Sequence, residues 1–505
     1  MPARTLMVQG TASSVGKSLL VAALCRYFQQ KGLKVAPFKS QNMSNNSFVT
    51  NEGLEIGRAQ AMQAEACGIE PSVDMNPVLL KCESDHRLQV VALGKAGPSM
   101  EGNAYYDYSS QLKPVITGAL NRLREKYDLV ILEGAGSPAE VNLQSRDLAN
   151  MFAAKEADAP VLLVGDIDRG GVFASLIGTL DLLSAEDRAR VKGLIINKFR
   201  GNLEILKPGV TFIEDKSKLP VLGVLPYLSG LAIAEEDAVA LDEPRENAVG
   251  AQLKVVVIKF PRISNFDDFQ PLEREKAVNL KWIEKPSQAE GADLVILPGT
   301  KATVADLQWL RAQGFESLLR QRAEEGLPLL GICGGYQMLG QAIEDPDQVE
   351  STEKLISGLG LLPVVTRFEK EKITSQINGE VKGENFFMEG QAGSSFKSYE
   401  IHMGRVERSA GARALFQLQE RNGQKVSETE GVLQGSVAGT LQHGLFENHS
   451  FRQGLLTALG KRKNLSLSSD DQSKEAEYDR LAQMVRDHLD TKFLDRLVLD
   501  QLAGL

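Results

Sequence analysis

Two segments in the second half of the chain could together perform nucleophilic acyl transfer. Residues 331–337, Gly-Ile-Cys-Gly-Gly-Tyr-Gln, follow an apolar run at 327–332 and begin a helical pattern. A strand that turns sharply into a helix exposes the side chain at the turn, and flanking glycines supply backbone angles that a Cβ would forbid. The helix N-terminus also favours a thiolate. We therefore predict that Cys333 is a nucleophile and that His443, in a similar strand-end context at 439–444, is its general base. A buried, inert cysteine is the weaker interpretation.

A second kind of chemistry is indicated near the start of the chain. Residues 9–18, Gln-Gly-Thr-Ala-Ser-Ser-Val-Gly-Lys-Ser, lie between a strand pattern and a helical pattern. Backbone amides there could wrap phosphates, Lys17 could neutralise the β- and γ-phosphate oxygens, and the Ser18 hydroxyl could hold Mg²⁺. The strict phosphate-loop pattern has four residues between its glycines, whereas five, beginning with Thr11, precede Gly16. A glycine-rich turn that only starts a helix is the alternative, but Gly-Lys-Ser directly after the first strand favours an ATP-binding loop.

Three further polar clusters follow apolar strand patterns in the first half. Glu133 ends one of these runs and is a candidate magnesium ligand. Asp166, Asp168 and Arg169 follow a second run, and Lys39 follows a third, where it could face a developing negative charge. Each cluster alone could equally be a solvated charge or a helix cap. Doubly wound folds place ligands at the carboxyl ends of their strands, so the clusters together predict one site beside the phosphate loop. We expect the two aspartates and the arginine to line its substrate-binding part.

These residues are positioned by two series of alternating strands and helices. Short apolar runs rich in β-branched residues alternate with amphipathic helical stretches, which indicates parallel sheets with helices on both faces. The first series also contains a long helix from 17 to 30. The expected fold class is α/β, with two doubly wound parallel-sheet domains. The predicted strands are 5–9, 35–38, 129–132, 161–164, 194–197 and 221–224 in the first series, and 253–260, 294–297, 329–332 and 437–441 in the second.

The two series are separated near residue 250. A chain of 505 residues with 43% apolar content is too long for a single core. The acidic, alanine-rich stretch 229–252 is predicted to be a linker between an ATPase domain, 1–228, and a second domain, 253–462. Apolar residues recur at helical spacing near the end of the chain, so the tail, 463–505, is predicted to contain a C-terminal helix.

The composition restricts partners and compartment. A net charge of −9 argues against nucleic acid or an anionic membrane as a general partner. The four cysteines include no CxxC pair, so neither a disulfide framework nor a zinc cluster is supported, and a reducing compartment fits best. No apolar run approaches the ~20 residues that span a bilayer, and the first strand pattern leaves no room for a signal sequence. We expect a cytoplasmic protein, whose oligomeric state the sequence does not indicate.

Taken together, these motifs resemble the cobyric acid synthase family, glutamine-dependent amidotransferases of cobalamin biosynthesis. The first half is similar to dethiobiotin synthetase-type ATPases, which have a P-loop NTPase-like fold and the same five-residue spacing in the phosphate loop. The second half is similar to class I glutamine amidotransferases, which have a flavodoxin-like fold. The segments that carry the resemblance in the first half are 8–11, 42–44, 55–60, 74–81, 164–173 and 196–201.

The resemblance implies further site residues. Asn197 would contribute to ATP binding. Gly299, in a Leu-Pro-Gly-Thr loop, would form an oxyanion hole with the backbone amide of Gly334, and Gln337 would lie near the bound glutamine. The corrinoid, glutamine and ATP are the implied small-molecule partners, and ATP with Mg²⁺ the implied cofactors.

The glutaminase pattern departs from its class at the third member of the triad. Class I glutaminases usually carry a glutamate two residues after the histidine, whereas Leu445 stands there and Glu447 lies further on. His402 lies in another family-like segment, but it is not at the base position, so a structural or binding role is expected. The roles of His402 and Glu447 stay open.

The resemblance implies amidation of the b, d, e and g carboxylates of adenosylcobyrinic acid a,c-diamide, giving cobyric acid. Hydroxide is a poor leaving group, so ATP would convert each carboxylate to an acyl phosphate, which ammonia released by Cys333 and His443 would displace. Two alternatives stay open. Cobyrinic acid a,c-diamide synthase shares both domains but amidates other carboxylates, and the segments 42–44 and 165–173 argue against it. A switch ATPase of the chromosome-partitioning kind would need neither Cys333 nor His443.

Overall fold

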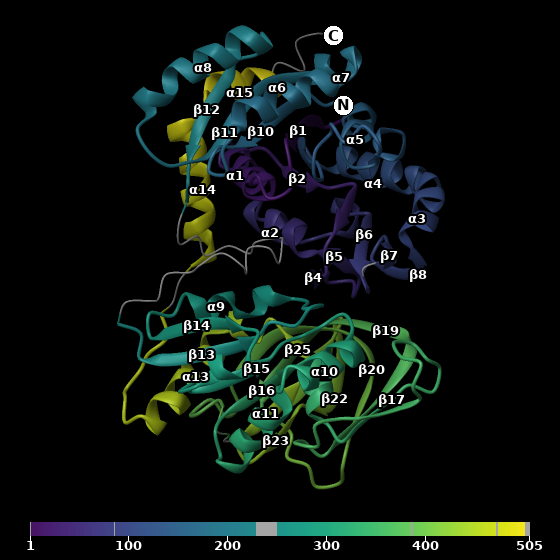
Figure 1. Cartoon of the computed structure of the whole chain (residues 1–505), viewed down its shortest axis with the longest axis vertical. Coiled ribbons are helices and arrows are strands. Elements are labelled where there is room, and N and C mark those ends of the chain that lie inside the picture. The colour runs from purple at the N-terminus through teal and green to yellow at the C-terminus, as the bar shows by residue number, and fades with distance from the viewer. Residues whose placement is uncertain are drawn as a thin grey trace.

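The computed structural model describes residues 2–84, 86–228, 250–383, 385, 387–470 and 473–499. The molecule has two halves stacked along its longest axis, and each half is built around a six-stranded sheet (Figure 1). All ten predicted strands correspond to strands of these sheets, and the predicted long helix is present. The expected α/β fold is therefore confirmed. Of the predicted linker, 229–252, residues 229–249 lie outside the described residues.

The first sheet is entirely parallel, with the order β12-β11-β10-β1-β9-β2. Its side chains alternate between two separate cores, with Met7 on one face and Leu6 and Val8 on the other. Burial on both faces explains why these strands appear in the sequence as continuous apolar runs. The strands are β1 (Arg4–Gly10), β2 (Val35–Phe38), β9 (Leu129–Glu133), β10 (Val161–Asp166), β11 (Val191–Phe199) and β12 (Val221–Pro226).

Helices cover both faces of this sheet. The core on one face includes residues of α4 (Lys113–Lys126), α5 (Met151–Ala157), α6 (Val172–Leu182) and α8 (Leu203–Ser217). On the other face lies α1 (Lys17–Gln29). The C-terminal tail completes that face with two helices, α14 (Lys474–His488) and α15 (Thr491–Leu499), where the sequence predicts one. Because α14 packs along α1, the tail closes the first half although it follows the second half in the sequence (Figure 1).

The second sheet has the order β14-β13-β15-β16-β24-β23 and is parallel except for β23. Two of its strands, β14 (Val278–Ile283) and β23 (Val432–Gln434), are not predicted from the sequence. The other strands are β13 (Leu253–Ile258), β15 (Leu294–Leu297), β16 (Leu329–Ile332) and β24 (Val437–Thr440). The helices of this half are α9 (Gln270–Glu273), α10 (Thr303–Ala312), α11 (Phe315–Glu324), α12 (Gly334–Leu339) and α13 (His449–Arg462).

The second half also contains a seven-stranded, largely antiparallel sheet that the sequence analysis missed. Its long strands alternate buried and exposed residues instead of forming continuous apolar runs, as expected for a sheet with one solvated face. The strands are β17 (Ala342–Glu344), β18 (Leu355–Ser357), β19 (Val364–Val381), β20 (Ser395–Arg408), β21 (Phe416–Arg421), β22 (Gln424–Glu430) and β25 (Gln442–His443). This sheet brings His443 beside Tyr399 of β20.

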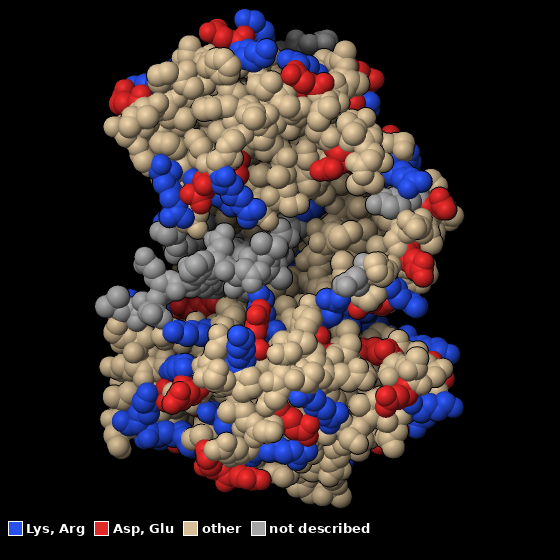
Figure 2. Space-filling view, in the orientation of Figure 1, with Lys and Arg blue, Asp and Glu red and all other residues tan. Residues whose placement is uncertain are grey.

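Smaller elements of the first half form the junction with the second. The hairpin β4 (Ser47–Val49) and β5 (Glu55–Gly57) leads into α2 (Arg58–Ala66), and β4 contacts β19 and β20. The remaining elements of this half are β3 (Gln41–Met43), β6 (Val78–Cys82), β7 (Arg87–Ala92), β8 (Lys95–Glu101), α3 (Gly102–Tyr108) and α7 (Ala185–Arg190). Figure 2 shows a hollow at the level where the halves meet, with Lys and Arg side chains on both sides of it.

Across the described parts of the chain, every helix is too short or too polar to cross a bilayer.

Candidate active sites

Cys333 lies on the sharp turn that the sequence predicts between β16 and α12. Its φ of 51° and ψ of −111° belong to a region that non-glycine residues rarely adopt, at a cost of about 1–3 kcal/mol. The neighbouring glycines are required by close approach. A Cβ on Gly335 would lie 2.1 Å from the backbone oxygen of Leu297, and one on Gly334 would lie 2.6 Å from Cγ2 of Thr300. The thiol is buried, and its Sγ is 3.6 Å from the backbone oxygen of Ile401.

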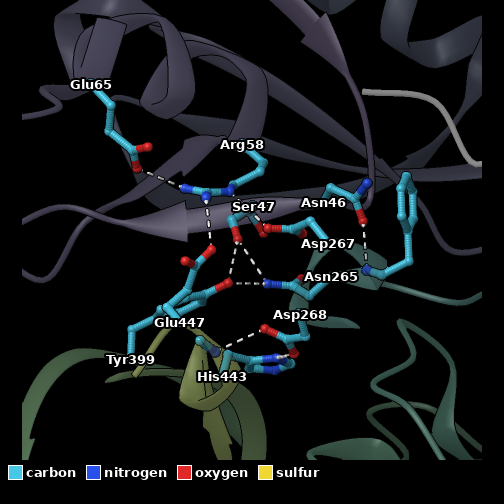
Figure 3. Close-up of polar contacts among 12 residues, drawn as sticks. Asn46, Ser47, Arg58, Glu65, Asn265, Asp267, Asp268, Tyr399, His443 and Glu447 are labelled. Carbon is cyan, nitrogen blue, oxygen red and sulfur yellow. Dashed lines mark hydrogen bonds and ion pairs between the residues drawn. The ribbon is translucent and has the colours of Figure 1, made fainter. Parts of the chain in front are cut away.

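His443 is held by a carboxylate from a distant part of the sequence. Its Nδ1 lies 2.6 Å from Oδ2 of Asp268, whose Oδ1 accepts a hydrogen bond of 2.8 Å from the backbone N–H of Gly444 (Figure 3). The imidazole ring stacks on Tyr399 with a centroid separation of 5.4 Å. Its second nitrogen, Nε2, is buried and has no hydrogen-bond partner among the described residues. That nitrogen is the one available for proton transfer.

The charge around His443 favours the imidazolium. Burial disfavours the charged ring and lowers its pKa, but the carboxylate of Asp268 and the nearby Cys333 together raise the pKa of His443 to about 10. A protonated His443 is thus stable at neutral pH. It can pair with a thiolate and can deliver a proton to a departing amine.

Asp268 is a site residue that sequence reasoning missed. It lies in the 3-10 turn η5 (Phe266–Phe269), shortly after β13, and is buried. Leu445 stands where class I glutaminases usually carry a glutamate, and the structure places the carboxylate of Asp268, from this other segment, beside His443. The rule that identified Glu133 does not select Asp268, because Glu133 ends its strand whereas the Asp267–Asp268 pair lies in a separate turn beyond the end of β13.

Gly299 and Gly334 border the Cys333–His443 pair. Gly334 is the first residue of α12, where a backbone N–H has no partner within the helix. A Cβ on Gly299 would lie 3.0 Å from Cε1 of His443 and 3.3 Å from Oγ of Ser264, so only glycine fits without displacement. The two glycine-bearing loops also pack against each other, with a Cβ on Gly334 lying 3.2 Å from the backbone nitrogen of Thr300.

Gln337 and His402 are both buried behind the thiol. Gln337 donates to the backbone oxygen of Met403 at 3.0 Å and accepts from Oγ1 of Thr303 at 3.3 Å, so it ties α12 to β20 and α10. His402 has Nδ1 3.0 Å from the backbone oxygen of Gly404, and burial lowers its pKa. A role of Gln337 in glutamine binding stays a prediction.

The phosphate-loop candidate starts α1 as predicted. Gly16 has a φ of 92°, and a Cβ there would lie 2.2 Å from Nδ2 of Asn197. Both the backbone angle and the lack of space for a side chain therefore require glycine. Lys17 donates to the backbone oxygens of Ala12 at 2.8 Å and Gly136 at 3.2 Å. The ammonium group therefore lies over the loop, where it could meet phosphate oxygens.

Ser18, Lys39 and Glu133 form one cluster beside this loop, in which Lys39 and Glu133 are buried and Ser18 is partly buried. Oε1 of Glu133 accepts from Oγ of Ser18 at 2.8 Å and from Nζ of Lys39 at 2.9 Å. Gln63, which sequence reasoning missed, donates to Oε2 of Glu133 at 2.5 Å. A hydroxyl and a carboxylate are the hard oxygen ligands that Mg²⁺ takes alongside phosphate and water, so this donor set fits that ion. Among the described residues, no group of three or more His, Cys, Asp or Glu side chains is arranged to hold a metal ion.

Asn197 and Thr11 join this loop to the sheet edge. Asn197 donates from Nδ2 to the backbone oxygen of Val15 at 2.8 Å, and the backbone N–H of Thr11 donates to Val164 at 2.9 Å. Both contacts hold the loop against the carboxyl ends of β10 and β11, the edge that the sequence predicts for the site.

Of the predicted substrate-binding residues, Asp166 lies beside the phosphate loop, whereas Asp168 and Arg169 are more exposed. Asp166 is buried and pairs at 3.2 Å with Lys198, which also donates to the phosphate loop. Asp168 pairs with Arg200 at 3.1 Å, and the side chain of Arg169 is 61% exposed. The predicted site residues thus form two clusters, one in each half of the molecule.

Comparisons with known proteins cover both halves. Residues 6–240 match the CobQ/CobB/MinD/ParA nucleotide binding domain, and residues 254–451 match the CobB/CobQ-like glutamine amidotransferase domain. A cobyric acid synthase of Sorangium cellulosum is 52% identical over 515 residues, which cover 99% of each chain. One of Dehalococcoides mccartyi is 50% identical over 97% of each chain. One of Alkaliphilus metalliredigens is 45% identical over 97% of this chain and 99% of its own. The chain therefore belongs to the cobyric acid synthase family.

Proposed function

We propose that this chain uses ATP and glutamine to amidate the b, d, e and g carboxylates of adenosylcobyrinic acid a,c-diamide, giving cobyric acid. Family membership makes it a glutamine-dependent, amide-forming ligase of cobalamin biosynthesis. The observation that carries the two-step chemistry is the presence in one chain of two separate sites: a Cys333–His443–Asp268 arrangement and a phosphate-loop cluster around Lys17 and Glu133. The choice of the b, d, e and g carboxylates is supported by the near-full-length similarity to cobyric acid synthases.

The first site would release ammonia. The thiolate of Cys333 attacks the amide carbon of glutamine, and the oxyanion is stabilised by the backbone N–H groups of Gly299 and Gly334. His443, held by Asp268, protonates the departing ammonia. The neutral imidazole then takes a proton from water, which attacks the thioester and releases glutamate. Free ammonia at neutral pH is mostly protonated to ammonium, which is not a nucleophile. The first site would therefore provide unprotonated ammonia for the amidation reaction.

The second site would activate the acceptor. A corrinoid carboxylate oxygen attacks the γ-phosphorus of ATP, the bond from this phosphorus to the β–γ bridging oxygen breaks, and ADP leaves as the acyl phosphate forms. Lys17 and Lys39 would neutralise the transferring phosphoryl group. Ser18 and Glu133 would hold Mg²⁺, which when bound neutralises charge on the phosphate oxygens. Ammonia then attacks the acyl carbon, and phosphate leaves.

The remaining predicted residues would bind the two substrates of this second site. We propose that the Thr11–Ser18 loop and Asn197 bind ATP, because both lie at the carboxyl edge of the first sheet. Asp166, Asp168 and Arg169 lie at the same edge and would face the corrinoid, since an acyl phosphate forms only where carboxylate and γ-phosphate meet.

The proposal is tested by following the corrinoid mass. The protein is incubated with ATP, Mg²⁺, glutamine and adenosylcobyrinic acid a,c-diamide, and products are sampled over time. Because the ring must be presented anew for each carboxylate, we expect a ladder of partly amidated species that converges on cobyric acid. Amidation confined to the a and c positions of cobyrinic acid would instead support the diamide synthase, and no corrinoid amidation with either glutamine or ammonium would overturn the proposal.

A further inference from the structure

Arg58 reaches from the first half of the molecule into the glutaminase site of the second. It is the first residue of α2, and its side chain is only 7% exposed. Its Nε donates to Oδ2 of Asp267 at 2.7 Å, and Nη1 donates to Oε1 of Glu65 at 3.2 Å (Figure 3). Nη2 lies 3.9 Å from Oε1 of Glu447. A planar guanidinium is suited to hold several carboxylates at fixed angles.

Two of these carboxylates lie on the two segments that form the histidine–aspartate pair. Asp267 directly precedes Asp268, and Glu447 follows His443 by four residues, in the turn η7 (Leu445–Glu447). The guanidinium of Arg58 therefore bridges the segment that carries the acid and the segment that carries the base. Movement of either segment relative to the other would lengthen at least one contact of Arg58.

The buried charges make Arg58 the local counter-ion. The pKa of Asp267 is raised to about 6, because burial together with the negative charges of Asp268 and Glu447 outweighs the lowering effect of Arg58. Without the guanidinium, the buried carboxylates of Asp267 and Asp268 would repel each other, and the partly exposed Glu447 would add to this repulsion. Lys474 pairs with Glu447 at 2.9 Å and with Glu65 at 3.7 Å, so it would compensate these two carboxylates and leave Asp267 without the charge of Arg58.

A second set of contacts joins the same segment to the first half. Asn265 donates to the backbone oxygen of Ser47 at 2.8 Å and to the hydroxyl of Tyr399 at 2.9 Å. The backbone N–H of Phe266 donates to Oδ1 of Asn46 at 3.3 Å. Because Tyr399 stacks on the His443 ring, both the acid and the base rest on residues that the first half fixes (Figure 3).

We propose that Arg58 is a positioning residue for glutamine hydrolysis, supplied to the glutaminase site by the ATP-binding half. The guanidinium fixes the backbone of Asp267 and Asp268 relative to His443, so that docking of the two halves completes the hydrolytic site. This inference rests on the proposed function, because it assumes that Cys333 and His443 hydrolyse glutamine.

The test replaces Arg58 by methionine, which fills similar volume without charge. Three rates are measured in the full chain: glutamine hydrolysis, glutamine-driven amidation and ammonium-driven amidation. Misplacement of reacting groups by ~1 Å costs about a hundredfold, so we expect kcat for hydrolysis to fall by about that factor. KM for glutamine and ammonium-driven amidation should change little. Thr374→Val is the matched control, since it removes another hydrogen bond between the halves, to Gly53, without touching the site.

Two further variants keep the inference falsifiable should Arg58→Met lose stability. Arg58→Lys retains the charge without the fork and should recover part of the lost kcat. Arg58→Met combined with Asp267→Asn relieves the unpaired carboxylate, and the double variant should lose no more kcat than Arg58→Met alone if Arg58 acts through Asp267.

Normal hydrolysis with impaired glutamine-driven amidation in Arg58→Met would overturn the inference, because it would place Arg58 in ammonia transfer. Equal losses with glutamine and ammonium would also overturn it and indicate a purely structural role. Failure of the proposed function would be visible separately, as an unaltered protein that does not amidate the corrinoid from either nitrogen source.

Discussion

Replacement of Asp268 by asparagine tests whether this residue is the missing third member of the glutaminase triad. The substitution keeps the size of the side chain but removes the negative charge of the carboxylate. In the unaltered protein, Oδ2 of Asp268 lies 2.6 Å from Nδ1 of His443, and Oδ1 accepts a hydrogen bond of 2.8 Å from the backbone N–H of Gly444. A hydrogen bond to a charged group contributes about 1.5–3 kcal/mol. Since each ~1.4 kcal/mol corresponds to a factor of ten in rate, kcat for glutamine hydrolysis should fall roughly 10- to 150-fold.

The pH dependence of Asp268→Asn provides a second and more specific result. In the unaltered protein, burial lowers the pKa of His443, but Asp268 and Cys333 raise it overall from 6.5 to about 10. A raised pKa means that the imidazolium is present below the ordinary value and is lost only as pH rises through the raised one. Without the carboxylate the pKa of His443 falls. As pH rises, activity that needs the imidazolium should therefore be lost at a lower pH than in the unaltered protein. The basic limb of the kcat profile should move toward neutral pH.

The assay measures glutamate release at saturating glutamine across the pH range between the ordinary pKa of histidine, 6.5, and the raised pKa of His443, about 10. Ammonium-driven amidation is the internal reference. Asp345→Asn is a matched control, because Asp345 is a fully buried aspartate of the same half that accepts from the backbone N–H groups of Val349, Glu350 and Ser351. It should lower stability without moving the basic limb. An unchanged kcat and an unchanged basic limb in Asp268→Asn would refute the assignment.

Four other substitutions have distinct expected results. Cys333→Ser should abolish glutamine-driven amidation and leave amidation at high ammonium concentration largely intact, as measured by product mass. Lys17→Ala should lower amidation with either nitrogen source by about a hundredfold or more, because one preorganised contact to the transferring phosphate is lost. Glu133→Gln should raise the Mg²⁺ concentration needed for half-maximal ammonium-driven amidation, since an anionic ligand is removed. Gly335→Ala should lower the free energy of unfolding in urea by about 1–3 kcal/mol, because the added Cβ would lie 2.1 Å from the backbone oxygen of Leu297.

Each of these four results has a contrary outcome. Loss of ammonium-driven amidation in a folded Cys333→Ser protein would contradict the two-site mechanism. Unchanged turnover in Lys17→Ala would reduce the phosphate loop to a helix start, and an unchanged Mg²⁺ requirement in Glu133→Gln would remove Glu133 from the metal site. An unfolding midpoint for Gly335→Ala equal to that of the unaltered chain would show that the turn before α12 accommodates the added Cβ without loss of stability.

Local features of the fold were predictable from the sequence. The ten strands that the sequence predicts in the two six-stranded sheets are continuous apolar runs because both of their faces are buried. The turn at Cys333 and the loop that ends at Lys17 are also visible locally, because glycines next to a strand end permit backbone angles that other residues rarely adopt. The antiparallel sheet of the second half was missed, since its half-exposed strands do not form such runs.

The partners of the site residues were decided by the tertiary structure alone. Asp268 and His443 lie 175 residues apart in the sequence, and Arg58 and Asp267 lie 209 residues apart. The residue types of these pairs allow many pairings, and their spacing restricts none of them. Only the packing of η5 against β25, and of α2 against the second half, brings them within hydrogen-bond distance. The sequence by itself therefore determined the fold class and the two turns that carry Cys333 and Lys17, whereas the orientation of His443 and its connection to the ATP-binding half depend on contacts between distant segments.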